Sequence, residues 1–105
     1  MNLKITNIFT LLIILLSVKV SFATEEVSID RGTIEIFHDG VITCRAFSWS
    51  DAGGISCTKS ASIDISKISN QIFKLKRGRV ERLVVAGQLC YAYTWAGAGG
   101  LSCLD

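Results

Sequence analysis

Hydrophobic and polar residues alternate over several short stretches of the chain, and turn signals interrupt the alternation at regular distances. A period of two is typical of β-strands that bury one face. The segments 27–30 and 33–37 follow this pattern and are joined by Arg31-Gly32; 73–76 and 79–81 repeat it around Arg77-Gly78. We therefore expect hairpins of the same kind in both halves of an all-β protein of about eight short strands.

The segment between two cysteines occurs twice in the chain. Residues 44–57 are CRAFSWSDAGGISC and residues 90–103 are CYAYTWAGAGGLSC, which agree at 8 of 14 positions with an offset of 46. A fixed period over this length indicates an internal duplication. We divide the chain into repeat one (27–57), a connector (58–72) and repeat two (73–103).

Each cysteine-flanked segment predicts a hairpin with its turn at the midpoint, at Ser50-Asp51 in repeat one and Ala96-Gly97 in repeat two. In that register the two cysteines of a repeat face each other, and Phe47 faces Gly54. One face of the hairpin then carries the cysteines with small side chains, and the other carries the aromatic rings. A ring opposite a glycine covers backbone that would otherwise be open.

Other stretches give weaker signals. Further turns are expected near Asp39-Gly40 and Ala86-Gly87. The apolar run 83–86 is the best candidate for a fully buried strand. In the connector, alternation over 62–65 gives way to a break at 70–71, so a short helical turn is expected within 66–71.

The four cysteines, Cys44, Cys57, Cys90 and Cys103, indicate two structural disulfides in an oxidising compartment. Of the three possible pairings, only Cys44 with Cys57 and Cys90 with Cys103 lets each repeat close its own bridge. Each bridge should stabilise the fold by roughly 3 kcal/mol, which matters for a chain with a small core. The expected fold is a disulfide-stapled sandwich or small barrel of two tandem hairpin repeats, related by a pseudo-two-fold axis.

Residues 1–23 have the features of a cleavable secretory signal peptide. Lys4 precedes an apolar run over 8–16, and Ser21 and Ala23 are the small residues before the expected cleavage site. The apolar run is too short to span a membrane. We expect residues 24–105 to form one domain, secreted or periplasmic, with no membrane span after signal removal.

Charge narrows the class of partner. The whole chain has 11 basic and 9 acidic residues, but Lys4 and Lys19 leave with the signal, so the remainder is close to neutral. Nucleic acid is therefore not expected as a partner, because its recognition needs a basic excess. Residues 24–60 are mainly acidic and residues 61–105 mainly basic, which predicts that the two repeats dock with complementary charge.

Candidate chemistry is sparse. The single histidine, His38, lies beside an expected turn, and repeat two has Val84 in its place. No Ser/His/Asp order, paired carboxylates, C-x-x-C or zinc-ligand spacing is present, and the glycines at 97–100 lack the Lys-Ser/Thr of a phosphate loop. We expect no catalytic residue, no metal and no cofactor, and the protein is not predicted to be an enzyme.

Two groups of residues could instead bind a partner. Aromatic side chains alternate along the cysteine hairpins and form either the core or a ligand-contact surface: Phe47, Trp49, Tyr91, Tyr93 and Trp95. Basic side chains cluster at the first hairpin of repeat two and form either a solvated tip or a patch for an acidic partner: Lys74, Lys76, Arg77, Arg79 and Arg82.

The sequence thus favours an exported, non-catalytic binding module that uses its aromatic disulfide hairpins to contact a protein or carbohydrate ligand. The alternative is a periplasmic inhibitor or immunity-type protein that binds an exported enzyme or toxin. A small secreted toxin or hydrolase is a third hypothesis, with the least support from the residues.

Overall fold

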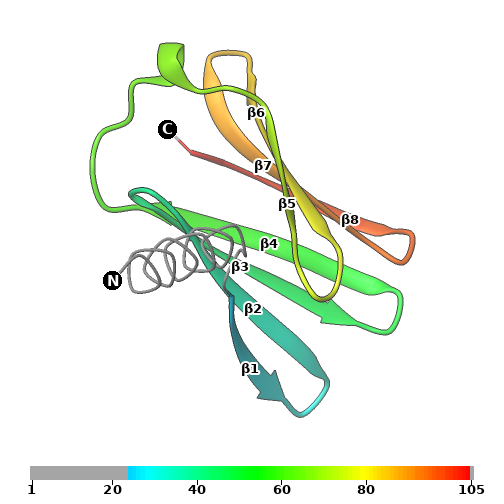
Figure 1. The fold of residues 1–105 in the computed structure, drawn as a ribbon. Coiled ribbons are helices and arrows are strands. Elements are labelled where there is room, and N and C mark those ends of the chain that lie inside the picture. The colour runs from blue at the N-terminus through cyan, green and yellow to red at the C-terminus, as the bar shows by residue number, and fades with distance from the viewer. Residues whose placement is uncertain (1–23, 105) are drawn as a thin grey trace, which may run out of the picture.

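The computed structural model describes residues 24–104, and the predicted signal peptide lies outside them. They form two four-stranded antiparallel sheets packed as an open sandwich (Figure 1). One sheet contains β1 (Glu25–Ile29), β2 (Gly32–Asp39), β3 (Ile42–Trp49) and β4 (Ala52–Lys59), and the other contains β5 (Gln71–Lys74), β6 (Arg79–Val85), β7 (Gln88–Trp95) and β8 (Ala98–Leu104). The predicted all-β fold is confirmed, as a sandwich rather than a barrel.

Both cysteine hairpins have the predicted register. Cys44 is paired across the strands with Cys57, and Phe47 with Gly54. The turns lie at 50–51 and 96–97, where Ser50 has φ 52° and Ala96 has φ 48°. Positive φ is typical of two-residue hairpin turns, whose twist matches that of the strands. Both predicted disulfides are present, which indicates an oxidising, extracytoplasmic setting.

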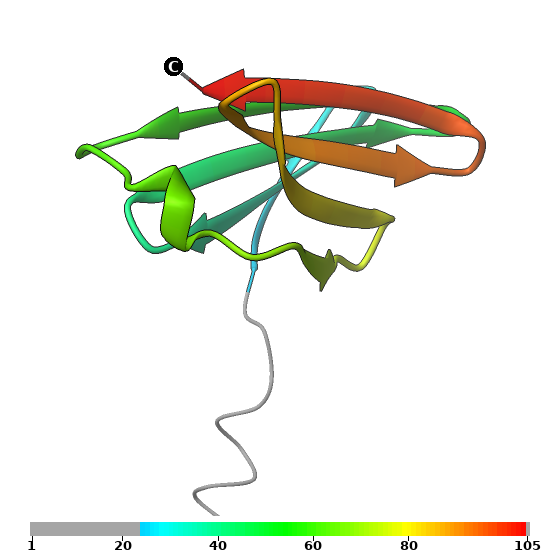
Figure 2. The same ribbon diagram turned by 90° about the horizontal axis from the view of Figure 1, so that it is seen from above.

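The two sheets bury opposite faces. Sheet β1–β4 buries its disulfide face, including Cys44 and Ala46, whereas sheet β5–β8 buries its aromatic face, including Tyr91 and Tyr93. A two-fold axis would bring equivalent faces together, so the predicted pseudo-two-fold arrangement is wrong. The sheets are instead stacked in the same sense, and their cysteine hairpins turn at the same end of the molecule (Figures 1 and 2). Large rings from repeat two fill the space above the small residues of repeat one.

The sandwich is closed most tightly along β4 and β8. A Cβ atom added to Gly100 would lie 3.1 Å from the Cα of Gly54, and one added to Gly53 would lie 2.9 Å from the Tyr93 ring. The backbone N–H of Cys57 donates to Ser102 Oγ at 3.0 Å in the same region. The glycines therefore allow an approach that side chains would prevent.

Acidic groups of repeat one meet basic groups of repeat two. Arg82 donates two hydrogen bonds to the Asp39 carboxylate, at 2.9 and 3.1 Å. Arg77 and Lys76 form ion pairs with Glu26, at 3.0 and 3.6 Å. The prediction of charge-complementary docking between the repeats is confirmed.

Two local predictions need correction. The run 83–86 is not a fully buried strand, because Val84 and Val85 are exposed where β6 runs into its turn at 86–87. The helical turn of the connector lies slightly earlier than expected, as the 3-10 helix Ile65–Lys67, and β5 begins already at Gln71. Asp64 caps this helix by accepting from the Ser66 N–H. Within residues 24–104, no helix is long and apolar enough to cross a membrane.

Candidate binding surfaces

The five predicted aromatic residues are divided between core and surface. Tyr91 and Tyr93 are buried between the sheets, Trp95 is partly buried at the margin, and Phe47 and Trp49 lie on the outer side of the first sheet. The sequence left open whether these rings are core or a ligand-contact surface, and the two repeats differ in the exposure of their rings. The aromatic face of repeat two is core, and that of repeat one is surface.

The buried tyrosines are fixed by their hydroxyl groups. Tyr91 donates to Asp39 at 2.7 Å, and Tyr93 donates to the carbonyl of Arg77 at 2.6 Å. Burial, and then the hydrogen bond to Asp39, raise the pKa of Tyr91 far above its ordinary value, and burial also raises the pKa of Tyr93. Neither phenol is available to a ligand in this structure.

The outer side of the first sheet is an apolar surface centred on two rings. Trp49 retains 49% of its accessible surface, and Val27 and Ile29 on β1 are similarly exposed. The expectation that the Phe47 ring covers the facing Gly54 is wrong, because nothing lies within 4 Å of a Cβ added there; the ring lies instead across the backbone of Gly32, where an added Cβ would be only 2.6 Å from it. We call this surface the aromatic face, and it comprises Val27, Ile29, Ile34, Ile36, Phe47 and Trp49.

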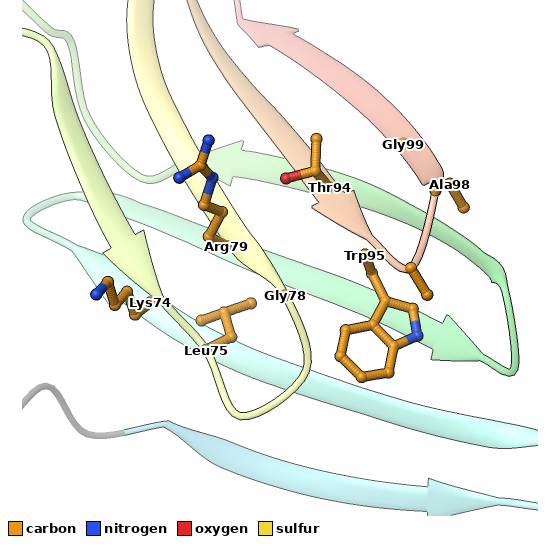
Figure 3. Close-up of a pocket in the computed structure, with 10 residues that line it drawn as sticks. Lys74, Leu75, Gly78, Arg79, Thr94, Trp95, Ala98 and Gly99 are labelled. Carbon is orange, nitrogen blue, oxygen red and sulfur yellow. The ribbon is translucent and has the colours of Figure 1, made fainter.

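The outer side of the second sheet is hollowed beside Trp95. This groove has a volume of about 610 Å³, and its side chains come from the ends of β5, β6, β7 and β8 (Figure 3). The indole Nε1–H of Trp95 donates to the carbonyl of Ser50 at 2.9 Å. We call this hollow the Trp95 groove, and its lining is Lys74, Leu75, Gly78, Arg79 and residues 94–99.

The predicted basic patch does not form one surface. Arg82 is largely covered and bound to Asp39, while Lys76 and Arg77 pair with Glu26. Lys74 and Arg79 remain exposed and line the Trp95 groove. Three of the five basic side chains thus hold the two sheets together, and two lie at the groove.

The histidine singled out from the sequence lies at the surface of the described part of the chain. His38 is exposed, and its Nδ1 lies 3.1 Å from the hydroxyl of Thr43. Residues 24–104 contain no group of three or more His, Cys, Asp or Glu side chains that could hold a metal ion.

Comparison with known proteins gives no relative. No protein-family model matches the chain, and neither a curated protein nor a solved structure is significantly similar to it.

Sequence reasoning missed the Trp95 groove. Only Trp95 and the two basic residues of its lining were singled out, whereas Leu75, Thr94 and Gly99 were not. The sequence carries no signal for them, because the groove depends on which face of the second sheet lies outside.

Proposed function

We propose that this protein is an exported, non-catalytic binding module that contacts its partner through the aromatic face. The observation that carries this proposal is the half-exposed Trp49, which lies on a largely apolar surface that is interrupted by the exposed Arg45. Exposed apolar surface of this kind usually marks an interaction site. Trp is also enriched among the residues that dominate binding energy in interfaces.

A protein surface fits the aromatic face better than a sugar. Four of its six side chains are aliphatic, namely Val27, Ile29, Ile34 and Ile36, whereas a sugar site sets several polar groups around its rings. Exposed aliphatic and indole groups gain most when a partner of matching shape removes them from water. An exported enzyme blocked by this face, as an inhibitor would do, is one partner of this class.

The test compares two truncations of exposed apolar residues. Trp49→Ala removes the centre of the aromatic face, and Ile65→Ala is the matched control because Ile65 is exposed in the connector, away from that face. The oxidised proteins are immobilised, retained proteins are identified, and each is purified and bound again. We expect a partner whose affinity falls at least tenfold with Trp49→Ala and stays unchanged with Ile65→Ala.

A glycan array is probed in parallel with the same variants. Retention of a glycan that depends on Trp49 would replace the protein partner with a carbohydrate. If neither a protein nor a glycan is bound in a Trp49-dependent manner, the aromatic face is not a binding surface and the proposal fails.

A further inference from the structure

The outer faces of the two sheets are the counterparts of the two faces that pack together inside the molecule. Because each sheet buries the face that the other exposes, the aromatic face corresponds to the buried side of sheet β5–β8, and the side that carries the Trp95 groove corresponds to the buried side of sheet β1–β4. Each residue of repeat one has its counterpart 46 positions later. Several contacts across the sandwich can therefore be transposed to contacts of the same kind between two molecules.

Resting on the proposed function, we propose that the partner of the aromatic face is a second copy of this chain. The aromatic face of one molecule covers the Trp95 groove of the next, head to tail, and reproduces the packing of the two sheets within one molecule. Each contact of this stacked pair follows from a contact inside the molecule when both residues are replaced by their counterparts.

The Trp95 groove has a counterpart inside the molecule. A second hollow, of about 400 Å³, lies beside Trp49 between the two sheets, and it is bounded in part by Arg77 and Trp95 from the second sheet. The lining of this second hollow also includes seven residues of repeat one: Ser28, Ile29, Gly32, Thr33, Ser48, Trp49 and Ser50. Their counterparts 46 positions later all line the Trp95 groove: Lys74, Leu75, Gly78, Arg79, Thr94, Trp95 and Ala96. Both sheets therefore have the same hollow. The second sheet covers the hollow beside Trp49, whereas nothing in the described part of the chain covers the Trp95 groove. The counterparts of the covering residues are Arg31 and Trp49.

Trp49 has a matching acceptor on the opposite face. Within the molecule, the Trp95 indole N–H donates to the carbonyl of Ser50 in a hairpin turn. The transposed bond joins Trp49 Nε1–H to the carbonyl of Ala96. Ala96 and Ser50 have nearly the same positive φ, 48° and 52°, as the equivalent residues of two hairpin turns.

Glu81 repeats the role of a buried carboxylate. Glu35 is 1% exposed and accepts from the backbone N–H groups of Lys76 and Arg77, at 3.0 and 2.8 Å. Its counterpart Glu81 is exposed on the outer side of the second sheet. In the stacked pair, Glu81 would accept from the backbone N–H groups at 30–31 of the next molecule.

The edge strands supply a further donor and acceptor pair. The N–H of Cys57 donates to Ser102 Oγ within the molecule. The transposed bond joins the N–H of Cys103 to the hydroxyl of Ser56. Both residues are exposed in the single molecule.

A glycine without a structural reason in the single chain gains one in the stack. Gly54 has no atom within 4 Å of an added Cβ and does not have positive φ, so nothing in the molecule requires glycine there. Its counterpart Gly100 requires glycine because β8 approaches β4 closely. Between two molecules, Gly54 would meet Gly100 of its neighbour in the same way.

At two pairs of positions where the repeats differ, both partners change to apolar residues, whereas the bond between Tyr91 and Asp39 has Arg45 and Val85 as its counterparts. The ion pair of Asp39 and Arg82 has Val85 and Ile36 as its counterparts, so two charges are replaced by two apolar groups. The contact between the rings of Phe37 and Phe73, at 5.7 Å, becomes one between Leu83 and Val27. Since Val27, Ile36, Leu83 and Val85 lie partly or fully exposed in the single chain, these pairs would bury apolar surface that is now in contact with water.

Charge favours the head-to-tail arrangement over a contact between identical faces. Lys74 and Arg79 line the Trp95 groove, so contact between two grooves would bring these cations together, and contact of a groove with an aromatic face avoids this. A heterologous contact of this kind forms a ring if the rotation closes and an open array if it does not.

The test uses two variants that each disable one face. Trp49→Ala weakens the aromatic face, and Thr94→Arg places a charged side chain in the Trp95 groove, where Thr94 is exposed. Sedimentation velocity of the oxidised proteins is followed over a range of concentrations. We expect the wild type to associate, Ile65→Ala to match it, and each of the two face variants to dissociate at least tenfold more readily. Intact disulfides and unchanged far-ultraviolet circular dichroism establish that both variants fold.

Mixing the variants tests the direction of the contact. An aromatic face survives in Thr94→Arg and a groove survives in Trp49→Ala, so their mixture should form a one-to-one heterodimer and grow no further. A contact between identical faces would give no such heterodimer and overturns the proposal. A wild type that stays monomeric also overturns it, and if that monomer still binds another protein through Trp49, the proposed function stands without it.

Discussion

The carboxylate of Glu35 accepts a hydrogen bond from the backbone N–H of Arg77, at 2.8 Å, across the contact between the two sheets. A second bond comes from the N–H of Lys76, at 3.0 Å. A buried carboxylate is tolerated only where such donors replace its water. Glu35 thus fixes the β5–β6 turn to β2 and sets how the second repeat lies on the first.

Glu35→Gln should lower the free energy of unfolding by about 1–3 kcal/mol, because a charge-assisted pair of hydrogen bonds is replaced by weaker neutral ones. Glu81→Gln is the matched control, since its side chain is exposed and surface substitutions usually change stability by less than about 0.5 kcal/mol. Urea unfolding at low protein concentration measures both. Equal losses in the two variants would contradict the role assigned to Glu35.

Alkaline pH should unfold the protein through its tyrosines. The chain has 2 tyrosines, and both have a pKa raised by burial. A raised folded-state pKa contributes stability that is fully present below the ordinary tyrosine value of about 10 and is lost as the pH rises above it. Phenolate absorbance should therefore appear only together with the loss of circular dichroism.

Tyr91→Phe separates this effect from general alkaline damage. Without its phenol, the variant should lose less stability than the wild type between neutral and strongly alkaline pH, although it is less stable at neutral pH because Asp39 loses a hydrogen bond. Phenolate absorbance that develops at ordinary tyrosine pH in the folded protein would show that the rings are not buried as described.

Periodicity and the duplicated cysteines predicted much of the fold, for physical reasons that act locally. The offset of 46 determined the disulfide partners, and symmetry of the hairpin determined that Phe47 faces Gly54. Such features depend on strand pairing within one repeat, which the pattern encodes directly.

The choice of buried face could not be predicted in the same way, because it depends on contacts between the repeats. Both copies have an aromatic face and a disulfide face, so either could become core. One position distinguishes the two aromatic faces, since the buried Tyr91 of repeat two stands where repeat one has the exposed Arg45. The Trp95 groove could not be predicted for the same reason, because it lies on the outer face of the second sheet and the sequence does not say which face that is.

The two disulfides should differ in their sensitivity to reductant. Cys44 and Cys57 are both buried between the sheets, whereas in the second bridge Cys90 is buried but Cys103 is exposed on the outer side of β8. Thiol–disulfide exchange requires access of a thiolate to a sulfur atom. Limited reduction of the dilute native protein, followed by alkylation and mass mapping, should label Cys90 and Cys103 before the first pair. Equal labelling of both pairs at early times would contradict the assignment of inner and outer faces.

Gly54 and Gly100 give a matched pair of substitutions that separates folding from association. Gly100→Ala should destabilise the single molecule, because the added Cβ would lie 3.1 Å from the Cα of Gly54. The Cβ added by Gly54→Ala meets nothing within 4 Å, so this substitution should leave stability at low concentration unchanged or raise it by up to about 1 kcal/mol through a less flexible unfolded chain.

If the stacked pair repeats the internal packing, Gly54→Ala should nevertheless weaken association, because its Cβ would then meet Gly100 of the neighbour. Urea unfolding at low concentration and sedimentation at high concentration give the two readouts. Unchanged association in Gly54→Ala would contradict the stacked pair. It would show that β4 of one molecule and β8 of the next are farther apart than β4 and β8 are within one molecule.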